Sequence, residues 1–409
     1  MRPTRRAFGY LILLGVVYFL ALQTQIGWLY ILEGALLSGF AASFVYPALA
    51  VRGLEALRTI RRPGQPSRPT EVEFNEDDPY EVTLELRNGS RLAKHLLVLE
   101  EKCPLAGPVE RNRTLVATEV PSGGVWRQTY SGECFKRGVY RFGPVGIESR
   151  APFGLFRRRG AVPAQGAAVV YPKHYPIDRL TIVPELKPAV VRENRSGTSI
   201  ELLGTREYRP GDPLKQIHWR STARLGKLIV KEFEREARPT VGVLFDTSRD
   251  FGSEKESTLE YSVKIAASVA YFAHQRGQAV RFLADGAPRN ELTWPKARRY
   301  LAEVQADRKR PLRQMLQKTD GIWSLVVVLP RVDWDVLPGI RGVAGRGLGV
   351  TVVLLEGFAG DEPDEEFATA VQGTGARVLR VSKGADLGLA LASAGSGLVN
   401  RRKELERAN

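Results

Sequence analysis

The N-terminus of the chain carries a long apolar run, and this run restricts where the protein can fold. Residues 7–51 contain no lysine or arginine and a single acid, Glu33. At a rise of about 1.5 Å per residue, such a run suffices for two helices that each cross a hydrocarbon core of about 30 Å. Polar residues 23–25 mark the turn, so we predict transmembrane helices at about residues 7–22 and 27–48.

Basic residues on both sides of this run predict the topology of the anchor, residues 1–51. The turn carries no positive charge, so by the positive-inside rule both ends face the cytoplasm. A cleaved signal peptide is the alternative, but no small-residue cleavage site follows the first apolar segment. We expect a multi-pass protein of the cell membrane whose soluble part is cytoplasmic. The flanking basic residues are Arg2, Arg5, Arg6, Arg52, Arg58, Arg61 and Arg62.

The charge balance of the chain suits more than one partner. The net charge is +15, which fits nucleic acid, anionic lipid or simple solubility. A nucleic-acid interface would interleave basic residues with more aromatic side chains than Tyr208 and Trp219. We therefore expect membrane lipid, and no nucleic acid, among the partners. The two cysteines, Cys103 and Cys134, are expected to be free thiols in a reducing compartment.

The first half of the soluble part alternates in polarity. A basic, proline-containing linker is predicted at residues 52–67, followed by apolar residues at period two. Asn88-Gly89 is typical of a hairpin turn. We predict an antiparallel β-sandwich over residues 68–180. Its expected strands lie near residues 72–74, 82–86, 96–100, 125–130, 139–142 and 167–171.

The second half has a different pattern, in which short continuous apolar runs alternate with helical periodicity. Continuous runs indicate strands buried on both faces, and strands alternating with helices predict a parallel, doubly wound α/β sheet over residues 240–384. A connector at residues 181–239 and a C-terminal helix at residues 385–409 flank it. Strands are expected near residues 241–245, 279–283, 325–329, 350–355 and 378–381, and helices near 259–273, 295–306, 311–317 and 336–343.

The sequence lacks the common catalytic signatures. It has no phosphate-binding loop, no dinucleotide fingerprint, no Gly-x-Ser-x-Gly elbow and no His-Glu-x-x-His pair. The histidines, at positions 95, 174, 218 and 274, have no metal-ligand spacing. We therefore predict a protein that is not an enzyme, and we name no catalytic residue.

The densest pattern of charged and aromatic residues lies at residues 204–234. Pro210-Gly211 suits the centre of a type II turn, and Ser221 is expected to cap a short helix. Two interpretations remain open: a salt-bridged connector that pins the two domains together, and a recognition surface for a partner. The candidate binding residues are Arg206, Glu207, Tyr208, Pro210, Gly211, Asp212, His218, Trp219, Arg220 and Arg224.

Several short motifs together resemble a known family. The run from Arg206 to Asp212, then Ile217-His218-Trp219, and upstream Pro152-Phe153-Gly154-Leu155-Phe156, look like the hallmark of the prokaryotic domain of unknown function 58 family. The likeness covers most of the chain, including the paired helices ahead of a β-rich domain.

The resemblance implies a fold, partners and a role. Members of the family often carry a von Willebrand factor A-like domain after the hallmark. They are commonly encoded beside MoxR-type AAA+ ATPases and transglutaminase-like membrane proteins. The implied role is that of a membrane-bound adaptor or scaffold for such an ATPase, in the assembly or maturation of membrane or envelope complexes.

An A-like domain also implies a test for a metal site. Its adhesion-type metal site uses an Asp-x-Ser-x-Ser loop after the first strand. Here Asp246 and Ser248 match that pattern, but Asp250 replaces the second serine, and the acid expected from a later loop is absent after residue 329. Oxygen ligands would suit Mg²⁺. We expect a degenerate site and no cofactor; the alternative is a metal-dependent enzyme or Mg²⁺-dependent ligand-binding protein that uses the Asp246 loop.

Overall fold

The structure is a computed structural model that describes most of the chain in two compact units. One unit comprises Met1–Lys173 with Arg298–Val304, and the other comprises His174–Ala297 with Gln305–Asn409. The described residues are 1–65, 71–177, 202–209, 212, 214–233, 240–284, 286–288, 290–306, 312–360 and 363–392. The predicted turn at Pro210-Gly211, most of the connector before residue 202, and the predicted C-terminal helix beyond residue 392 lie outside them.

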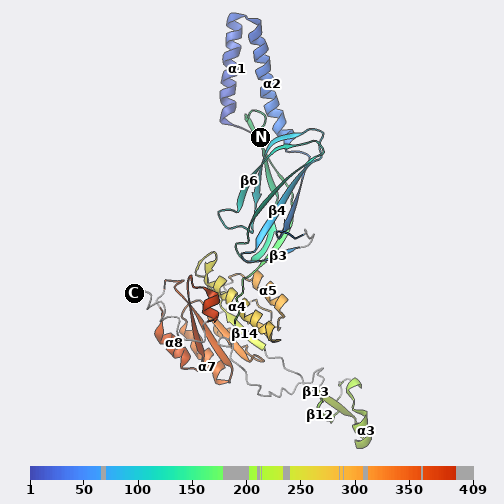
Figure 1. The fold of residues 1–409 in the computed structure, drawn as a ribbon, viewed down its shortest axis with the longest axis vertical. Helices are drawn as coiled ribbons and strands as arrows, with labels where there is room; N and C mark the ends of the chain where they lie inside the picture. The colour runs from blue at the N-terminus through green and yellow to red at the C-terminus, as the bar shows by residue number, and fades with distance from the viewer. Residues whose placement is uncertain are drawn as a thin grey trace. The chain divides into compact units, whose positions relative to one another are not determined.

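Two apolar helices begin the first unit, as predicted. Helix α1 spans Arg5–Thr24 and α2 spans Gly27–Ala50, and each is long and apolar enough to cross a membrane. The two run side by side in opposite directions (Figure 1). The hydroxyl of Tyr10 in α1 donates to the carbonyl oxygen of Leu36 in α2 at 2.8 Å.

The last turn of α2 belongs to the core of the β-rich part. Ala50 is fully buried there, and Tyr46 Oη accepts a hydrogen bond from the backbone N–H of His95 at 2.8 Å. The ammonium of Lys94 donates to the carbonyl of Leu49 at 2.7 Å, so a cation satisfies the carbonyl end of the helix. Burial lowers the pKa of Lys94. These contacts join helix and sheets directly.

The predicted linker at residues 52–67 is wrong over most of its length. Strand β2, Leu54–Arg61, begins only a few residues after α2 ends. Leu54 and Ile60 face the core at period two, but Arg58 occupies a core position between them. Arg58 interrupts the alternation of apolar residues, so the sequence predicts a basic segment after the second apolar helix instead of a strand.

Three sheets form the rest of this unit. Strands β2, β4 and β7 make one; β1, β10, β9, β5 and β6 make a second; β3, β11 and β8 make a third. All pairings are antiparallel except that of β11 with β3. The bounds are β1 Arg2–Pro3, β3 Val72–Asn75, β4 Pro79–Asn88, β5 Lys94–Lys102, β6 Asn112–Val120, β7 Val125–Glu133, β8 Gly138–Phe142, β9 Val145–Ser149, β10 Phe156–Val162 and β11 Gly166–Tyr171.

The predicted strands are present, but besides β2 four further ones, β1, β6, β9 and β10, were not predicted. The hairpin turn predicted at Asn88-Gly89 is also wrong, because β4 and β5 belong to different sheets. The Asn88 side chain is instead buried, and its Nδ2 donates to the carbonyls of Leu92 at 2.8 Å and Val120 at 3.1 Å. This asparagine therefore holds together loops that lead to two sheets.

The second unit contains a five-stranded sheet in the order β17-β14-β18-β19-β20, and every pairing in it is parallel. This confirms the predicted parallel α/β region. The strands are β14 Thr240–Phe245, β17 Ala279–Leu283, β18 Ser324–Leu329, β19 Gly349–Glu356 and β20 Arg377–Ser382. Its helices are α4 Thr258–Gln275, α6 Leu312–Met315, α7 Leu337–Gly345, α8 Glu365–Gln372 and α9 Leu387–Ala392. Helix α5, Trp294–Glu303, begins in this unit, and its residues from Arg298 on are assigned to the first unit.

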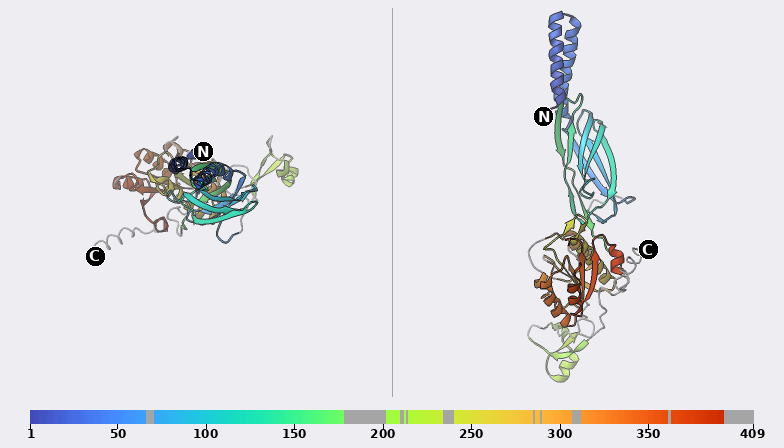
Figure 2. Two further views of the ribbon diagram at one scale, coloured as in Figure 1. Left: turned by 90° about the horizontal axis from the view of Figure 1, so that it is seen from above. Right: turned by 90° about the vertical axis from the view of Figure 1, so that its left-hand side faces the viewer.

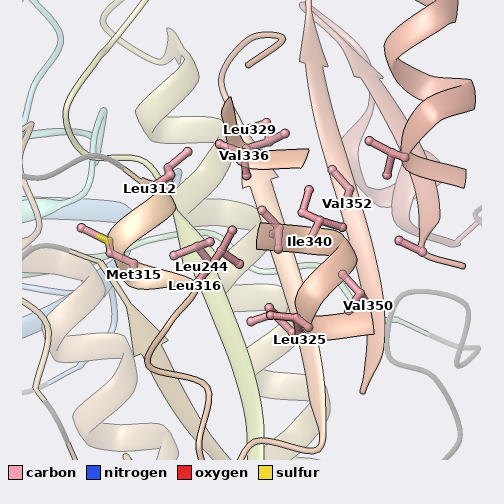
Figure 3. Close-up of a cluster of buried hydrophobic side chains, with 14 of the residues drawn as sticks. Leu244, Leu312, Met315, Leu316, Leu325, Leu329, Val336, Ile340, Val350 and Val352 are labelled. Atoms are coloured by element: carbon pink, nitrogen blue, oxygen red, sulfur yellow. The ribbon is translucent and has the colours of Figure 1, made fainter. Parts of the chain in front are cut away.

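Helices cover both faces of this sheet (Figure 2). Leu244, Leu325 and Val352 pack against Ile340 of α7 and Phe367 of α8 on one face (Figure 3). Alternate residues of the same strands point to the other face, where α4 packs on β14 and β17. Strands β14 and β18 are buried along their whole length, as their continuous apolar runs predicted. Helix α8 was not predicted.

Candidate functional site

The hallmark residues gather in one local structure. Strands β12, Leu202–Glu207, and β13, Ile229–Phe233, pair antiparallel, with Arg206 opposite Val230. Between them lie a 3-10 turn, η1 Leu214–Gln216, and a short helix, α3 Trp219–Leu225. The backbone N–H of His218 donates to Ile229 O at 2.7 Å, which ties the helix back to the hairpin (Figure 1). Residues 202–233 therefore form a β-hairpin that presents a helix, called here the hallmark hairpin.

An ion pair joins Arg206 of β12 to Asp212, which follows the strand. The guanidinium of Arg206 donates to both carboxylate oxygens of Asp212, at 2.7 and 2.8 Å. Asp212 Oδ2 also accepts from the backbone N–H of Arg209 at 2.8 Å. These hydrogen bonds, first that from Arg206, lower the pKa of Asp212 to about 2. The planar fork of arginine suits this two-point contact, which lysine cannot reproduce.

The cap of α3 differs from the predicted one. His218, not Ser221, is the N-cap, and its Nδ1 accepts from the backbone N–H of Ser221 at 3.2 Å. The helix ends at Gly226, whose φ of 67° is readily adopted by glycine. Thr222 Oγ1 accepts from the N–H of Ile229 at 3.0 Å. The hydrogen bonds of His218 and Thr222 thus fix helix α3 against the hairpin.

The other face of α3 is apolar and basic. Trp219 is 67% exposed and Leu214 of η1 is also 67% exposed. Arg220 and Arg224 are exposed, and neither has a carboxylate within ion-pair distance in the part of the chain that the structure describes. An exposed tryptophan beside unpaired arginines is what a recognition surface offers. Trp219 is therefore not a core residue of its own unit.

The structure thus assigns different tasks to the predicted binding residues. Arg206 and Asp212 form the internal ion pair, and His218 caps the helix. Glu207 pairs with Lys227 at 3.1 Å on the surface. The side chains that remain available on α3 are Trp219, Arg220 and Arg224, with Tyr208 half-buried at the end of β12 and Pro210 and Gly211 outside the described residues.

The predicted metal loop follows β14, where a parallel sheet places ligand-binding residues. Asp246 Oδ1 accepts from the backbone N–H of Ser248 at 2.7 Å. Asp250 points elsewhere: its Oδ1 accepts from the N–H of Leu259 at 3.0 Å and from the hydroxyl of Thr258 at 3.3 Å. Asp250 therefore caps the first turn of α4, together with the N-cap Ser257.

This geometry does not fit a magnesium site. Mg²⁺ takes near-octahedral oxygen ligands, so a site made by both acids of the loop needs Asp246 and Asp250 to converge on one ion. One oxygen each of Asp246 and Asp250 is already held by backbone N–H groups of different segments. Among the described residues, no group of three or more histidine, cysteine, aspartate or glutamate side chains is placed to hold a metal ion. The loop matches the adhesion-type pattern only in part, because Asp250, which replaces the second serine, caps helix α4.

A buried charge network in the first unit was missed from the sequence. Arg58 and Glu101 form a two-point ion pair, with both distances 2.8 Å and both side chains fully buried. Tyr130 Oη donates to Glu101 Oε1 at 3.0 Å, and burial raises the pKa of Tyr130. The assignment of Arg58 to the basic flank of the membrane segment is therefore wrong in the folded chain. The period-two spacing of Leu97, Leu99 and Glu101 in β5 is the sequence pattern that indicates a core position for Glu101.

Two neighbours of Arg58 are neutralised as well. Arg61 pairs with Glu81 at 2.8 Å and Arg62 with Asp78 at 3.1 Å. Of the arginines predicted to follow the second apolar helix, only Arg52 lacks a carboxylate partner within the described residues.

A comparison with known protein families finds a match that includes most of the hallmark hairpin. Residues 204–304 match the family model described as protein of unknown function DUF58. An uncharacterized protein of Bacillus subtilis strain 168, YeaD, is 23% identical over 359 residues, which are 83% of this chain and 86% of that protein.

The solved structures that align with this chain do so over parts of it and with low structural similarity. An alkylpurine DNA glycosylase of Pseudomonas fluorescens aligns with 11% identity over 32% of this chain and only 34% of its own, at a TM-score of 0.16. An immunoglobulin-like protein of Pseudomonas aeruginosa aligns with 16% identity over 27% of this chain and 90% of its own, at 0.15. Residues 204–304, which include the ion pair of Arg206 and the helix of Trp219, match the DUF58 family model, and the sequence motifs predicted a resemblance to this family.

Proposed function

We propose that this protein is a membrane-anchored, non-enzymatic adaptor that binds a MoxR-type AAA+ ATPase through its hallmark hairpin. The anchor is the pair α1 and α2, with both ends in the cytoplasm. The adaptor serves the assembly or maturation of membrane or envelope complexes, with transglutaminase-like membrane proteins as further partners. The hairpin's exposed face would meet an acidic surface that has an apolar pocket for the indole ring.

The observation that carries this proposal is the exposure of Trp219. A tryptophan that is 67% exposed on a helix of the family-matched segment has no role in the described core. Tryptophan and arginine are the residues that most often dominate binding energy in interfaces. The Arg206–Asp212 ion pair fixes Asp212 relative to β12, and such pre-ordering reduces the entropy that binding would otherwise lose.

The finer fold assignments belong to the same proposal. We infer that the β-rich part of the first unit is a β-sandwich, because a single core cluster contains Leu84 and Leu86 of one sheet and Leu97, Leu99 and Ile147 of another. We infer that the parallel sheet is von Willebrand factor A-like. The position of Asp246 directly after β14 supports that inference, although the loop has lost its metal-binding pattern.

The test uses the full-length protein in phospholipid nanodiscs and a purified MoxR-type ATPase from the same organism, without nucleotide. We expect capture by the native protein and at least about thirtyfold weaker capture by Trp219→Ala, the effect of losing a hot spot. Leu389→Ala is the control, because Leu389 on α9 is equally exposed, at 68%. Melting temperatures should be unchanged in both variants, since both side chains are on the surface. Equal capture by Trp219→Ala and the native protein would reject the hairpin as the binding surface.

A further inference from the structure

The loop at residues 150–155 lies against the apolar helices. The ring of Phe156, at the start of β10, is centred 5.3 Å from the rings of both Phe40 and Phe44 in α2. A Cβ placed on Gly39 would lie 3.3 Å from Phe153 Cε2, so the glycine makes room for that ring. Phe153 is nevertheless 56% exposed. One edge of its ring touches α2, and the remainder faces outward beside the helices.

The contacts of Phe153 show how far along the helices the loop reaches. The same Cβ on Gly39 would lie 3.1 Å from the hydroxyl of Tyr10, so Phe153 and Tyr10 meet α2 at one level. Tyr10 comes five residues after Arg5, the first residue of α1, which corresponds to about 7.5 Å along the axis. Phe153 therefore extends past the level of Arg5 and Arg6, where the apolar surface of the helices begins.

The N-terminal arginines and the arginines of β10 are brought together by strand pairing. Strand β1 pairs with β10, with Arg2 opposite Arg157. Thr4 Oγ1 donates to the carbonyl of Gly154 at 2.7 Å, which fixes the start of α1 against the loop. A Cβ placed on Gly154 would lie 3.6 Å from Nη1 of Arg6. The N-terminal arginines thus lie beside the arginines of the loop and of β10. These residues are called here the basic collar: Arg2, Arg5, Arg6, Arg150, Arg157, Arg158 and Arg159.

Acidic residues neutralise only part of the collar. Buried Glu148 accepts from Arg150 and Arg159, and it lies 3.9 Å from Arg157. In the described part of the chain, no carboxylate lies within ion-pair distance of Arg2, Arg6 or Arg158. Arg158 Nε is buried without a hydrogen-bond partner. The collar therefore retains positive charge directly beside the apolar helices and an outward-facing aromatic ring.

We propose that the basic collar and Phe153 form a third membrane contact that binds the headgroup of an anionic phospholipid. This inference rests on the proposed anchoring of α1 and α2 in a bilayer. In this contact Arg2, Arg6 and Arg158, which have no carboxylate partner in the described part of the chain, bind the lipid phosphate, which arginine holds through two parallel hydrogen bonds. Phe153 inserts between headgroups at the boundary of the acyl chains, where aromatic side chains are favoured. Zwitterionic lipid lacks the net charge that the collar selects.

The first test measures the lipid that stays bound to the full-length protein. The protein is reconstituted with equal amounts of phosphatidylglycerol and phosphatidylcholine, re-extracted in mild detergent, and its bound lipid is counted by native mass spectrometry. We expect phosphatidylglycerol to be retained preferentially. The doubly substituted Arg6→Gln/Arg158→Gln protein should lose roughly fivefold in preference for each arginine removed. Arg331→Gln/Arg341→Gln, which removes two exposed charges of the second unit, is the control. Equal preference in all three proteins would overturn the proposal.

The second test locates Phe153 without changing any arginine. A nitroxide is attached to Phe153→Cys and, as an aqueous control, to Val109→Cys, which replaces a side chain that is 95% exposed. Native Cys103 and Cys134 are buried and remain unlabelled in the folded protein. In anionic liposomes, oxygen should increase the electron-spin relaxation rate of the label at position 153 more than a water-soluble nickel chelate does. The opposite order, matching position 109, would overturn the insertion of Phe153.

Extraction with alkaline carbonate separates failure of this inference from failure of the proposed anchoring. Native and arginine-substituted proteins should both remain in the liposomes, because α1 and α2 hold them there. Release of the native protein would reject the anchor and the collar together. Retention of the native protein with no lipid preference would reject the collar alone.

Discussion

Arg58 and Glu101 form a two-point ion pair in the core of the first unit, and neither side chain is exposed to solvent. Arg58 also donates to the carbonyl of Gly143 at 3.0 Å and to that of Ala164. Its guanidinium lies over the ring of Phe142, 4.9 Å from the centroid. Every charged atom of the pair therefore has partners, which is the condition under which burying two charges is tolerated.

Breaking this pair should destabilise the protein strongly. Arg58→Met leaves a buried carboxylate without its partner and should lower the free energy of unfolding by about 3–5 kcal/mol. The double variant Arg58→Met/Glu101→Leu should recover most of that loss, because no charge remains buried. Arg61→Met is the control and should cost less than about 1 kcal/mol, since its pair with Glu81 is partly exposed. Urea unfolding in detergent micelles measures all three. A double variant as unstable as Arg58→Met would contradict this account.

Asp250, in the loop after β14, should contribute to the stability of the protein and not to the binding of a metal ion. Asp250→Ala removes the acceptor for the N–H of Leu259 and should destabilise α4 by about 1 kcal/mol. Asp250→Asn keeps an oxygen acceptor and should lose less. Capture of the ATPase in the absence of nucleotide should be the same with Mg²⁺ and with EDTA. A loss of capture in EDTA that Mg²⁺ restores in the native protein, but not in Asp246→Ala, would show a working metal site.

The Arg206–Asp212 ion pair should be insensitive to pH across the physiological range. The pKa of Asp212 is about 2, below the ordinary value of 3.8, because Arg206 and the N–H of Arg209 hold the ionised form. Its contribution to stability is thus fully present above about pH 4 and is lost as the pH falls through 2. Carbon-detected NMR of labelled aspartate should show no titration of Asp212 between pH 8 and 5.

Arg206→Gln should raise the pKa of Asp212 toward its ordinary value. Lys227→Gln, which breaks only the exposed pair with Glu207, should leave it unchanged. An Asp212 that titrates near pH 4 in the native protein would mean that the Arg206 contact is not maintained in solution.

The topology prediction concerns both chain ends. Arg2, Arg5 and Arg6 before α1 and Arg52 after α2 flank a turn without positive charge, so both ends should be cytoplasmic. A reporter fused after Asn409 should be active only if it functions in the cytoplasm. Activity of an alkaline phosphatase fusion at that position, which requires export, would reject the two-helix hairpin.

Sequence reasoning succeeded where one physical effect dominated. Strands β14 and β18 are buried on both faces, so their apolar runs identified them and the parallel sheet without knowledge of their neighbours. It failed where the environment of a residue depends on a distant partner. Arg58 is a core residue only because Glu101 pairs with it. Strand β10 carries a run of arginines that does not look like a strand, and the acid that accepts from Arg159, Glu148, lies in another strand.

The candidate site shows the same division. The motif around Arg206 and Asp212 predicted the segment that matches the DUF58 family model, because the spacing of those residues is local. Whether Trp219 is a core residue or a surface residue could not be decided, since a tryptophan has the same sequence signature in both places. The basic collar was also out of reach, because it depends on the pairing of Arg2 with Arg157.

The direct junction between α2 and the sheets has a mechanical consequence. Lys94 and His95 clamp the end of the helix, and β2 starts within a few residues, so no slack chain separates the two. A pull on the β-rich part would be delivered to α1 and α2 as a torque that tilts them, instead of being absorbed by an elastic tether. A force on the β-rich part would therefore reach the two apolar helices without loss in a flexible linker.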